Sequence, residues 1–437
     1  MLRLGGLEIT RLSGPVSFTY LVPKEDAFLD NAAKGTFLPI VVLLGDHHKD
    51  YENSCDDCEE EKGCYKVEGD RFLGAINRVG RDIPIDFYIE SHSEEANYES
   101  TSPLAQIITD TKGCRNVVER KSSSYNCKFK NVRWHKSDPR VTIDKLESVE
   151  IHSSYMANME SEFENNARQI SSLMGSYGGI YTKSDNLLVT FISALRDSVI
   201  DNDTFDGLSL KVAKMFTKSI IGNSKSMIYK QLTKSKIDVN IELYFYRSIS
   251  KFFSNLSVID ENVIDIFSGA FSKRSPLLLN AEKILERIIM MTMSPYSGRL
   301  EQIDSMNRDR YITMIKFINQ IYSHVNIGLV DLYFTLRMLK TPKGNVNSYV
   351  SIGFFGARHC KDIADFLSTV TDYYKVVASS YTLEESDENP DRCITFDKDV
   401  DVDADLERYA EMRQKHEQLT VFKDVLQEEY RSRGENF

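Results

Sequence analysis

The sequence predicts an α/β protein with a mostly parallel central sheet, flanking helices and a large all-helical insertion. Three observations predict this class. Short apolar runs alternate with helical patterns over 1–152, helical spacing dominates 153–345, and strand-like patterning returns over 346–400. We therefore expect 1–152 and 346–400 to form the two halves of one α/β core. A C-terminal helix is expected within 401–437.

In the first half, short strands are separated by helical segments. "GLEITRLSGPVSFTYLVPK" predicts two short strands around a Ser13-Gly14-Pro15 turn, and "LPIVVLLG" predicts a strand buried on both faces. "DRFLGAINRVG" predicts an amphipathic helix, "IPIDFYIE" a second apolar strand, Pro103 to Asp110 a helix, and Val132 to His135 a third strand. Strands separated by helices with short connections indicate βαβ units and a parallel sheet.

The middle of the chain is predicted to be a helical block. "NLLVTFISALRDSVI", "VNIELYFYRSISKFFSNL", "NAEKILERIIMMTM" and "DRYITMIKFINQIYSHVNIGLVDLYFTLRML" carry apolar residues at helical spacing. After it, "NSYVSIGFFGARHCKDIADFLSTV" predicts a strand followed by a helix, and "DYYKVVASSYTL" predicts a strand. A last helix is expected from about Ala404 to Arg431, with charges on most of its faces.

Composition narrows the class of protein. The 437 residues are 41% hydrophobic and 27% charged, which is typical of a globular protein. The net charge of −11 argues against binding nucleic acid through bulk electrostatics. Only the basic stretch Lys211 to Lys236 favours nucleic-acid binding, and such a run is more often a solvated helix face.

No apolar run approaches the roughly 18 residues that a membrane span needs, and no signal peptide is visible. We expect a cytoplasmic protein without a membrane span.

Two copies of a G-x2-H motif follow predicted buried strands. Gly45-Asp46-His47-His48 follows "LPIVVLL", and Gly356-Ala357-Arg358-His359 follows "VSIGFF". Gly45 would permit a sharp exit from its strand. Because adjacent parallel strands end at the same rim of a sheet, where α/β proteins bind ligands, we expect His48 and His359 to meet there. Alternatively, "GDHH" is a polar turn with solvated histidines.

Two other strand ends would add polar groups to this rim. "IDFYIESH" contributes Glu90 and His92, and "VRWHKSDPR" contributes His135, Asp138 and Arg140. A histidine with a carboxylate can activate water directly or through a divalent metal, and arginine suits an anion or a developing oxyanion. Each residue also has a purely structural interpretation. Glu90 would be an exposed carboxylate at a strand end, and His135 a core histidine beside Trp134. Asp138 would form a turn before Pro139, and Arg140 would belong to a structural ion pair.

Seven cysteines are present, and three of them form a C-x2-C-x5-C cluster, Cys55, Cys58 and Cys64. A structural zinc site needs four ligands, so this set requires Cys114, Cys127 or His47 to complete it. The competing readings are local disulfides, if the compartment is oxidising, or reduced thiols on an acidic loop.

These motifs resemble those of the erythromycin esterase, TraB, ChaN and Tiki superfamily. "VVLLGDHH" is similar to its first motif, "FYIE" to its glutamate strand and "IGFFGARHCKDIADFL" to its late GxxH motif with the helix that follows. The resemblance implies ester hydrolysis, metal-dependent peptide cleavage or haem-iron binding. It assigns His48 and His359 as the paired site histidines and Glu90 as the acidic partner, with His47 and Arg140 as weaker additions. "GDHH…C…C", "DFYIES" and "RWHKSDPR" also look similar to proteins of large DNA viruses, which implies an origin but no activity.

Two hypotheses follow. The first is a hydrolase of ester or peptide bonds in which His48, Glu90, His359 and Arg140 are catalytic; a divalent Mn, Co or Zn ion would be held by His47, His48, Glu90 and His359. Its substrate would be a small molecule or peptide. The second is a non-catalytic structural or host-interaction protein, for example a virion component, that contacts a protein partner through the helical block or the C-terminal helix.

Overall fold

The computed structural model forms two compact units. One unit comprises Met1–Asp138, Gln231–Val239 and Asp331–Phe437, and the other comprises Pro139–Lys230 and Asn240–Val330. The structure describes residues 1–47, 55, 58, 62–90, 103–111, 114, 127–136, 187–201, 203–222, 232, 239–254, 261–268, 274–293, 317, 321, 324–325, 328–339, 347–381 and 392–432.

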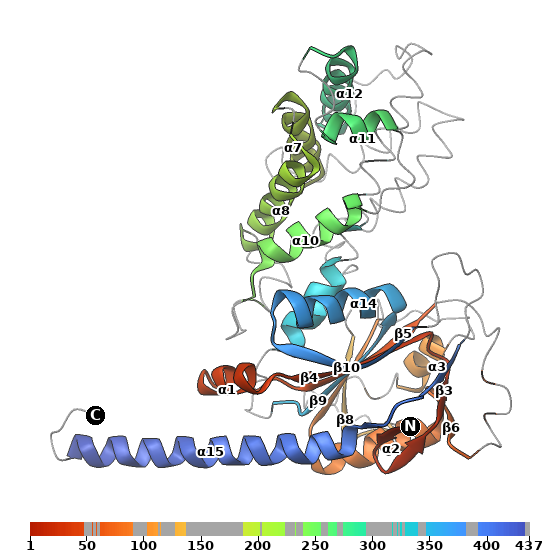
Figure 1. The fold of residues 1–437 in the computed structure, drawn as a ribbon, viewed down its shortest axis with the longest axis vertical. Coiled ribbons are helices and arrows are strands. Elements are labelled where there is room, and N and C mark those ends of the chain that lie inside the picture. Colours follow the sequence, from red (N-terminus) through yellow and green to blue (C-terminus); the bar gives the residue numbers. More distant parts are fainter. Residues whose placement is uncertain are drawn as a thin grey trace. The chain divides into compact units, whose positions relative to one another are not determined.

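The first unit is built on a six-stranded sheet (Figure 1). Its strands lie in the order β10 (Tyr374–Tyr381), β4 (Ser17–Pro23), β5 (Ile40–Asp46), β9 (Val350–Gly356), β7 (Ile85–Ile89) and β8 (Val132–Lys136). The four strands from β5 to β8 run parallel, whereas β4 and β10 run antiparallel to their neighbours. The prediction of a mostly parallel sheet within an α/β fold is therefore confirmed.

The strands that precede the two G-x2-H motifs lie next to each other. In the register of β5 and β9, Gly45 pairs with Phe355 and Asp46 pairs with Gly356. All residues of both strands are buried, as the lack of polar alternation in their sequences predicts. The two motifs therefore start at the same rim of the sheet.

One face of this sheet carries the main hydrophobic core. Alternate side chains of the strands, such as Val42, Phe87 and Ile352, pack against four helices on that face. These helices are α1 (Glu25–Ala33), α2 (Asp70–Asp82), α3 (Pro103–Asp110) and the start of α15 (Val402–Ser432). The helix α14 (Ala357–Asp365) lies on the opposite face, as Figure 1 shows, and continues into a π-helical turn, Phe366–Val370.

The helix α15 is fixed to the core near its beginning. The guanidinium of Arg413 lies 4.3 Å from the ring centroids of both Phe37 and Tyr349, and the hydroxyl of Tyr409 donates a hydrogen bond to the carbonyl of Leu38. Stacking on two aromatic rings suits the planar guanidinium. The C-terminal helix that the sequence predicts thus begins as an integral part of the core.

The first unit also contains two three-stranded sheets. One has the order β12 (Val400–Asp401), β1 (Leu2–Leu4) and β2 (Leu7–Ile9), and the other has the order β11 (Cys393–Thr395), β3 (Arg11–Ser13) and β6 (Cys64–Lys66). The predicted Ser13-Gly14-Pro15 turn joins β3 to β4, with Gly14 at a φ of +113°, a value that favours glycine. Since β3 and β4 belong to different sheets, this turn is a crossover between sheets.

The described part of the second unit is helical, as its sequence predicts. Its helices are α7 (Leu187–Asp201), α8 (Phe205–Gly222), α10 (Ile241–Ser254), α11 (Glu261–Ser268) and α12 (Pro276–Met293). Buried apolar side chains from α8 and α10, among them Phe216 and Phe245, pack with ring centroids 5.7 Å apart. The aromatic stripes of this block are therefore packing surfaces where the structure describes them.

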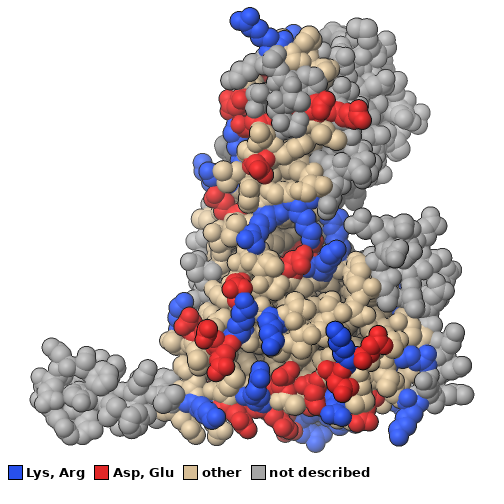
Figure 2. All heavy atoms as spheres, in the orientation of Figure 1, with Lys and Arg blue, Asp and Glu red and all other residues tan. Residues whose placement is uncertain are grey.

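Charged side chains of both signs lie on the face of the molecule drawn in Figure 2. On that face, Lys and Arg are interspersed with Asp and Glu around the sheet-containing unit. Among the described residues, no helix has both the length and the apolar character needed to cross a bilayer.

Candidate functional site

The carboxyl ends of three neighbouring parallel strands bring polar side chains together. Asp46 ends β5, Gly356 ends β9, and Glu90 directly follows β7. The backbone N–H of Glu90 donates to the carbonyl of Phe354 at 3.1 Å, which extends the pairing of β7 and β9 by one residue. This is the rim at which the sequence predicts a site.

A buried triad lies at this rim. His359 Nδ1 is 2.6 Å from Asp331 Oδ1, and His359 Nε2 is 3.4 Å from Glu90 Oε1. The side chains of His359, Glu90 and Asp331 are 8%, 7% and 2% exposed. The predicted convergence of Glu90 and His359 is therefore present, with a third group, Asp331, on the far side of the imidazole.

The G-x2-H spacing has a local physical reason at its second copy. Gly356 is the N-cap of α14, and its N–H donates to Glu90 Oε2 at 2.7 Å. His359 lies three residues further, in the first turn of the same helix. Glu90 thus accepts a backbone hydrogen bond from the start of the helix with one oxygen and faces the imidazole with the other, an arrangement that the partial positive charge of a helix N-terminus favours.

The carboxylates control the proton affinity of the imidazole. Burial by itself would lower the pKa of His359, but Asp331 and Glu90 outweigh it and raise that pKa to about 10. Burial also raises the pKa of Asp331 to about 7, against the opposing effect of His359. Near neutral pH, His359 is therefore an imidazolium ion held between two carboxyl groups.

Asp46 has a separate buried partner. Its Oδ1 lies 3.0 Å from Arg392 Nη1, and the two side chains are 0% and 2% exposed. Arg392 immediately precedes β11, so this ion pair connects the end of β5 to a strand almost 350 positions later in the chain. Burying two charges is tolerated when they are paired in this way.

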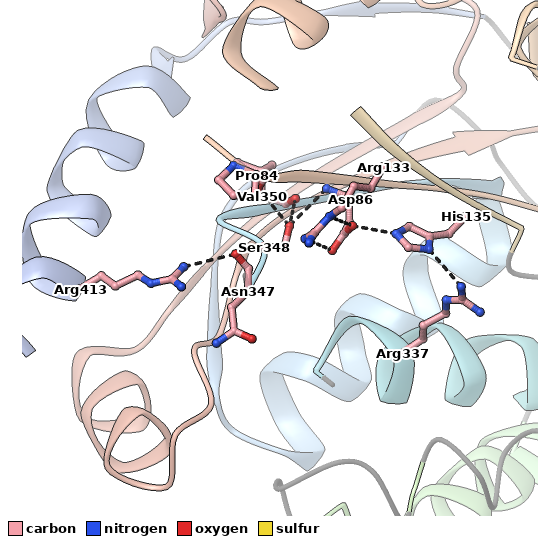
Figure 3. Close-up of polar contacts among 9 residues, drawn as sticks. All are labelled: Pro84, Asp86, Arg133, His135, Arg337, Asn347, Ser348, Val350 and Arg413. Carbon is pink, nitrogen blue, oxygen red and sulfur yellow. Dashed lines mark hydrogen bonds and ion pairs between the residues drawn. The ribbon is translucent and has the colours of Figure 1, made fainter. Parts of the chain in front are cut away.

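His135 belongs to a second polar cluster, which Figure 3 shows. Its Nε2 lies 2.7 Å from Asp86 Oδ1, its Nδ1 accepts from Arg337 at 3.1 Å, and its ring stacks on Tyr88 at 4.6 Å between centroids. Arg133 also pairs with Asp86. Both ring nitrogens are thus engaged within this cluster, as the reading of a buried structural histidine anticipates.

The histidine of the second cluster differs from that of the triad in the direction of its pKa shift. Burial lowers the pKa of His135, an effect that exceeds the opposing influence of Asp86. Because an arginine can only donate, Nδ1 of a neutral His135 is the acceptor and Nε2–H donates to Asp86. Nearby in Figure 3, the Ser348 hydroxyl contacts the carbonyls of Pro84 and Val350, which ties the start of β7 to β9.

Several of the predicted site residues lie outside the described residues. These are His48, His92, Asp138 and Arg140. His47 is described, half-buried, at the end of β5. The meeting of His48 with His359 and the role of Arg140 therefore stay predictions.

Sequence reasoning missed Asp331 and Arg392. Asp331 stands in "GLVDLYF", where one acidic residue interrupts an apolar helical run, and this is a signal for a buried charge that needs a partner. Arg392 stands next to Cys393 in "ENPDRC", where nothing in the sequence distinguishes it from a surface charge.

The described residues contain one group suited to a metal by its ligand atoms. This group is Cys55, Cys58 and Cys64, whose sulfur atoms lie within 4.8 Å of one another. In the structure, Cys58 pairs with Cys64, Cys55 with Cys393, and Cys114 with Cys127 in disulfides. The fourth cysteine of the cluster is thus Cys393.

The metal predicted at the sheet rim is a separate question. Glu90 and His359 form an ion pair there. That they also bind a metal with His47 and His48 stays a prediction.

Comparison with known proteins finds no relative of this chain. No family model matches the chain, no curated protein matches it, and no solved structure matches its fold. The chemistry of the described side chains is therefore the basis of the function proposed below.

Proposed function

We propose that the protein is a hydrolase of ester or peptide bonds whose reacting groups lie at the carboxyl rim of β5, β9 and β7. The observation that carries this proposal is the placement of His359 between Asp331 and Glu90 where neighbouring parallel strands end. The similarity of the motifs to the erythromycin esterase, TraB, ChaN and Tiki superfamily supports the same reaction class.

Each member of the triad has a distinct role in the proposed reaction. Asp331 positions the imidazole through Nδ1 and helps to keep it charged, as a carboxylate does for a catalytic histidine. Glu90 accepts a proton from water, which attacks the acyl carbon. His359 supplies positive charge for the developing oxyanion and donates a proton to the leaving group through Nε2. His48 would be the second histidine, with Arg140 as a contact for an anionic group.

The test compares the wild type with Glu90→Gln, His359→Gln and Asp331→Asn on a panel of p-nitrophenyl esters and fluorogenic peptides. We expect the wild type to hydrolyse at least one compound class, and we expect the first two substitutions to lower kcat/KM by about 10²- to 10⁴-fold, the usual contribution of a general acid or base. His416→Gln, in a histidine of α15 outside the triad, is the matched control.

Circular dichroism would establish that each variant is folded. Folded Glu90 and His359 variants that keep the wild-type rate would contradict the catalytic assignment. Dialysis against a chelator and readdition of Mn²⁺, Co²⁺ or Zn²⁺ would show whether the reaction needs a divalent ion.

A non-catalytic scaffold, such as a virion component, is the second candidate. The observation that favours it is that all three triad side chains are less than a tenth exposed, as expected of an ion cluster that only stabilises the fold. In that case the wild type turns over no compound of the panel, and His359→Gln changes stability alone. A protein partner for the helical block or α15, and a cytoplasmic location, belong to this proposal as predictions.

A further inference from the structure

Four cysteines from distant parts of the chain share one small cluster. The sulfur atoms of Cys55, Cys58 and Cys64 lie within 4.8 Å of one another, and Cys393 is bonded to Cys55. The first three are only 3–6% exposed. They form a cluster separate from the main hydrophobic core, with Cys393 packed against it.

The sheet beneath these cysteines sets their positions. Cys64 begins β6 and Cys393 begins β11, and these strands flank β3 on its two sides. Cys64 pairs with Arg11 and Cys393 pairs with Ser13. Since residues 11 and 13 are two positions apart on one strand, both cysteines project from the same face of the sheet.

The backbone before Cys64 is also fixed. Gly63 has a φ of +91°, and its carbonyl accepts hydrogen bonds from the N–H groups of Thr10 and Arg11 at 2.8 and 3.2 Å. Main-chain hydrogen bonds and strand pairing thus hold Cys64 in place independently of any bond between sulfur atoms.

This set has the composition of a structural zinc site. Zinc in such sites is held tetrahedrally by four thiolates at about 2.3 Å, which places the sulfur atoms about 3.8 Å apart, and a C-x2-C pair commonly supplies two of them. Cys55 and Cys58 form that pair, Cys64 is the third ligand and Cys393 the fourth. Cys114 and Cys127, by contrast, form a disulfide outside this cluster.

We propose that Cys55, Cys58, Cys64 and Cys393 bind one zinc ion when they are reduced, and that the two disulfides are the oxidised, metal-free state of the same site. A thiol reductant supplies two electrons and two protons to each disulfide, which yields four thiols. Zinc then binds the four thiolates and releases four protons. In a reducing compartment, the metal takes over from the disulfides in linking Cys64 of β6 and Cys393 of β11 to Cys55 and Cys58.

The experiment uses the full chain, reduced under denaturing conditions with a phosphine and refolded with or without one equivalent of zinc under argon. After desalting, we expect one zinc per chain by elemental analysis. We expect Co²⁺, used in place of zinc, to give the visible spectrum of a tetrahedral tetrathiolate. Cys393→Ser should lose most of the zinc retention and the cobalt charge-transfer band.

Cys114→Ser/Cys127→Ser is the matched control, because it removes two cysteines outside the cluster, and it should retain one zinc. The proposal is overturned if the reduced, folded wild type holds no zinc, or if Cys393→Ser retains as much zinc as the control. If Cys393→Ser does not fold, the cobalt spectrum of the reduced wild type is the test. A tetrathiolate spectrum supports the site, and cobalt bound without that spectrum contradicts it.

Discussion

His359 is the residue whose environment has the clearest energetic consequence. Its folded-state pKa of about 10 lies above the unfolded value of about 6.5, since Asp331 and Glu90 favour the charged form. The folded state therefore binds its proton more tightly than the unfolded state between these values. This contribution to stability is fully present below about pH 6.5 and is lost as the pH rises toward 10.

The first prediction concerns this pH dependence. We expect the free energy of unfolding of the wild type to fall by a few kcal/mol between about pH 7 and pH 10. The raised pKa of Asp331, about 7, also makes stability fall as the pH rises, but it does so between about pH 4 and pH 7, below this range. His359→Gln should flatten the profile between about pH 7 and pH 10. Urea denaturation at a series of pH values measures it.

His416→Gln is again the control and should retain the wild-type slope. A slope that is unchanged by His359→Gln would show that the imidazole is not held charged between the two carboxyl groups.

At the scale of elements, Gly45 shows why the first motif contains a glycine. The strand β5 does not turn at Gly45 but continues to Asp46, and Gly45 lacks a positive φ. A Cβ at this position would lie 2.7 Å from the Cα of Ala357 and would also meet the hydroxyl of Ser17. Glycine is required because α14 approaches β5 closely, and not because the chain exits sharply, as its sequence position suggests.

The second prediction follows from this close approach. Gly45→Ala should destabilise the protein by about 1–3 kcal/mol, because the backbone of α14 cannot easily move away. Gly74→Ala in α2 is the matched control, since nothing lies within 4 Å of its added Cβ. It should stabilise by about 0.5–1 kcal/mol, because alanine favours the helix. Denaturant midpoints of the two variants, measured side by side, must move in opposite directions.

At the scale of the molecule, the Cys55–Cys393 link joins residues 338 positions apart, whereas Cys114–Cys127 spans only 13. A cross-link restricts the unfolded chain more when it closes a longer loop. In the oxidised, metal-free protein, we expect Cys55→Ser/Cys393→Ser to cost up to about 5 kcal/mol and Cys114→Ser/Cys127→Ser about 3 kcal/mol. Chemical denaturation without reductant measures both, and equal costs would argue against loop closure as the dominant effect.

Local patterns account for most of what the sequence predicted correctly. The strands β5, β7, β8 and β9 follow from apolar runs, and α2, α3 and α15 follow from helical spacing. Buried strands need apolar residues on both faces and helices need one apolar stripe, so each element can be recognised within its own segment. The adjacency of the two G-x2-H strands was also predicted and is confirmed by the pairing of β5 with β9.

The partners of the site residues could not be predicted in this way. Asp331 reaches His359 from the helical residues 331–338, Arg392 reaches Asp46, and Cys393 completes the cysteine cluster. A carboxylate or thiol looks the same in sequence whether it faces solvent or a buried cation.

The sequence by itself determined the α/β class, the positions of the strands and helices, and the glutamate and histidine at the rim. Only the tertiary structure decided that the imidazole lies between two carboxyl groups and that the fourth cysteine is Cys393. The physical reason is range: secondary structure depends on side chains a few positions apart, whereas a buried charge or thiol is defined by what strand order and helix packing bring against it.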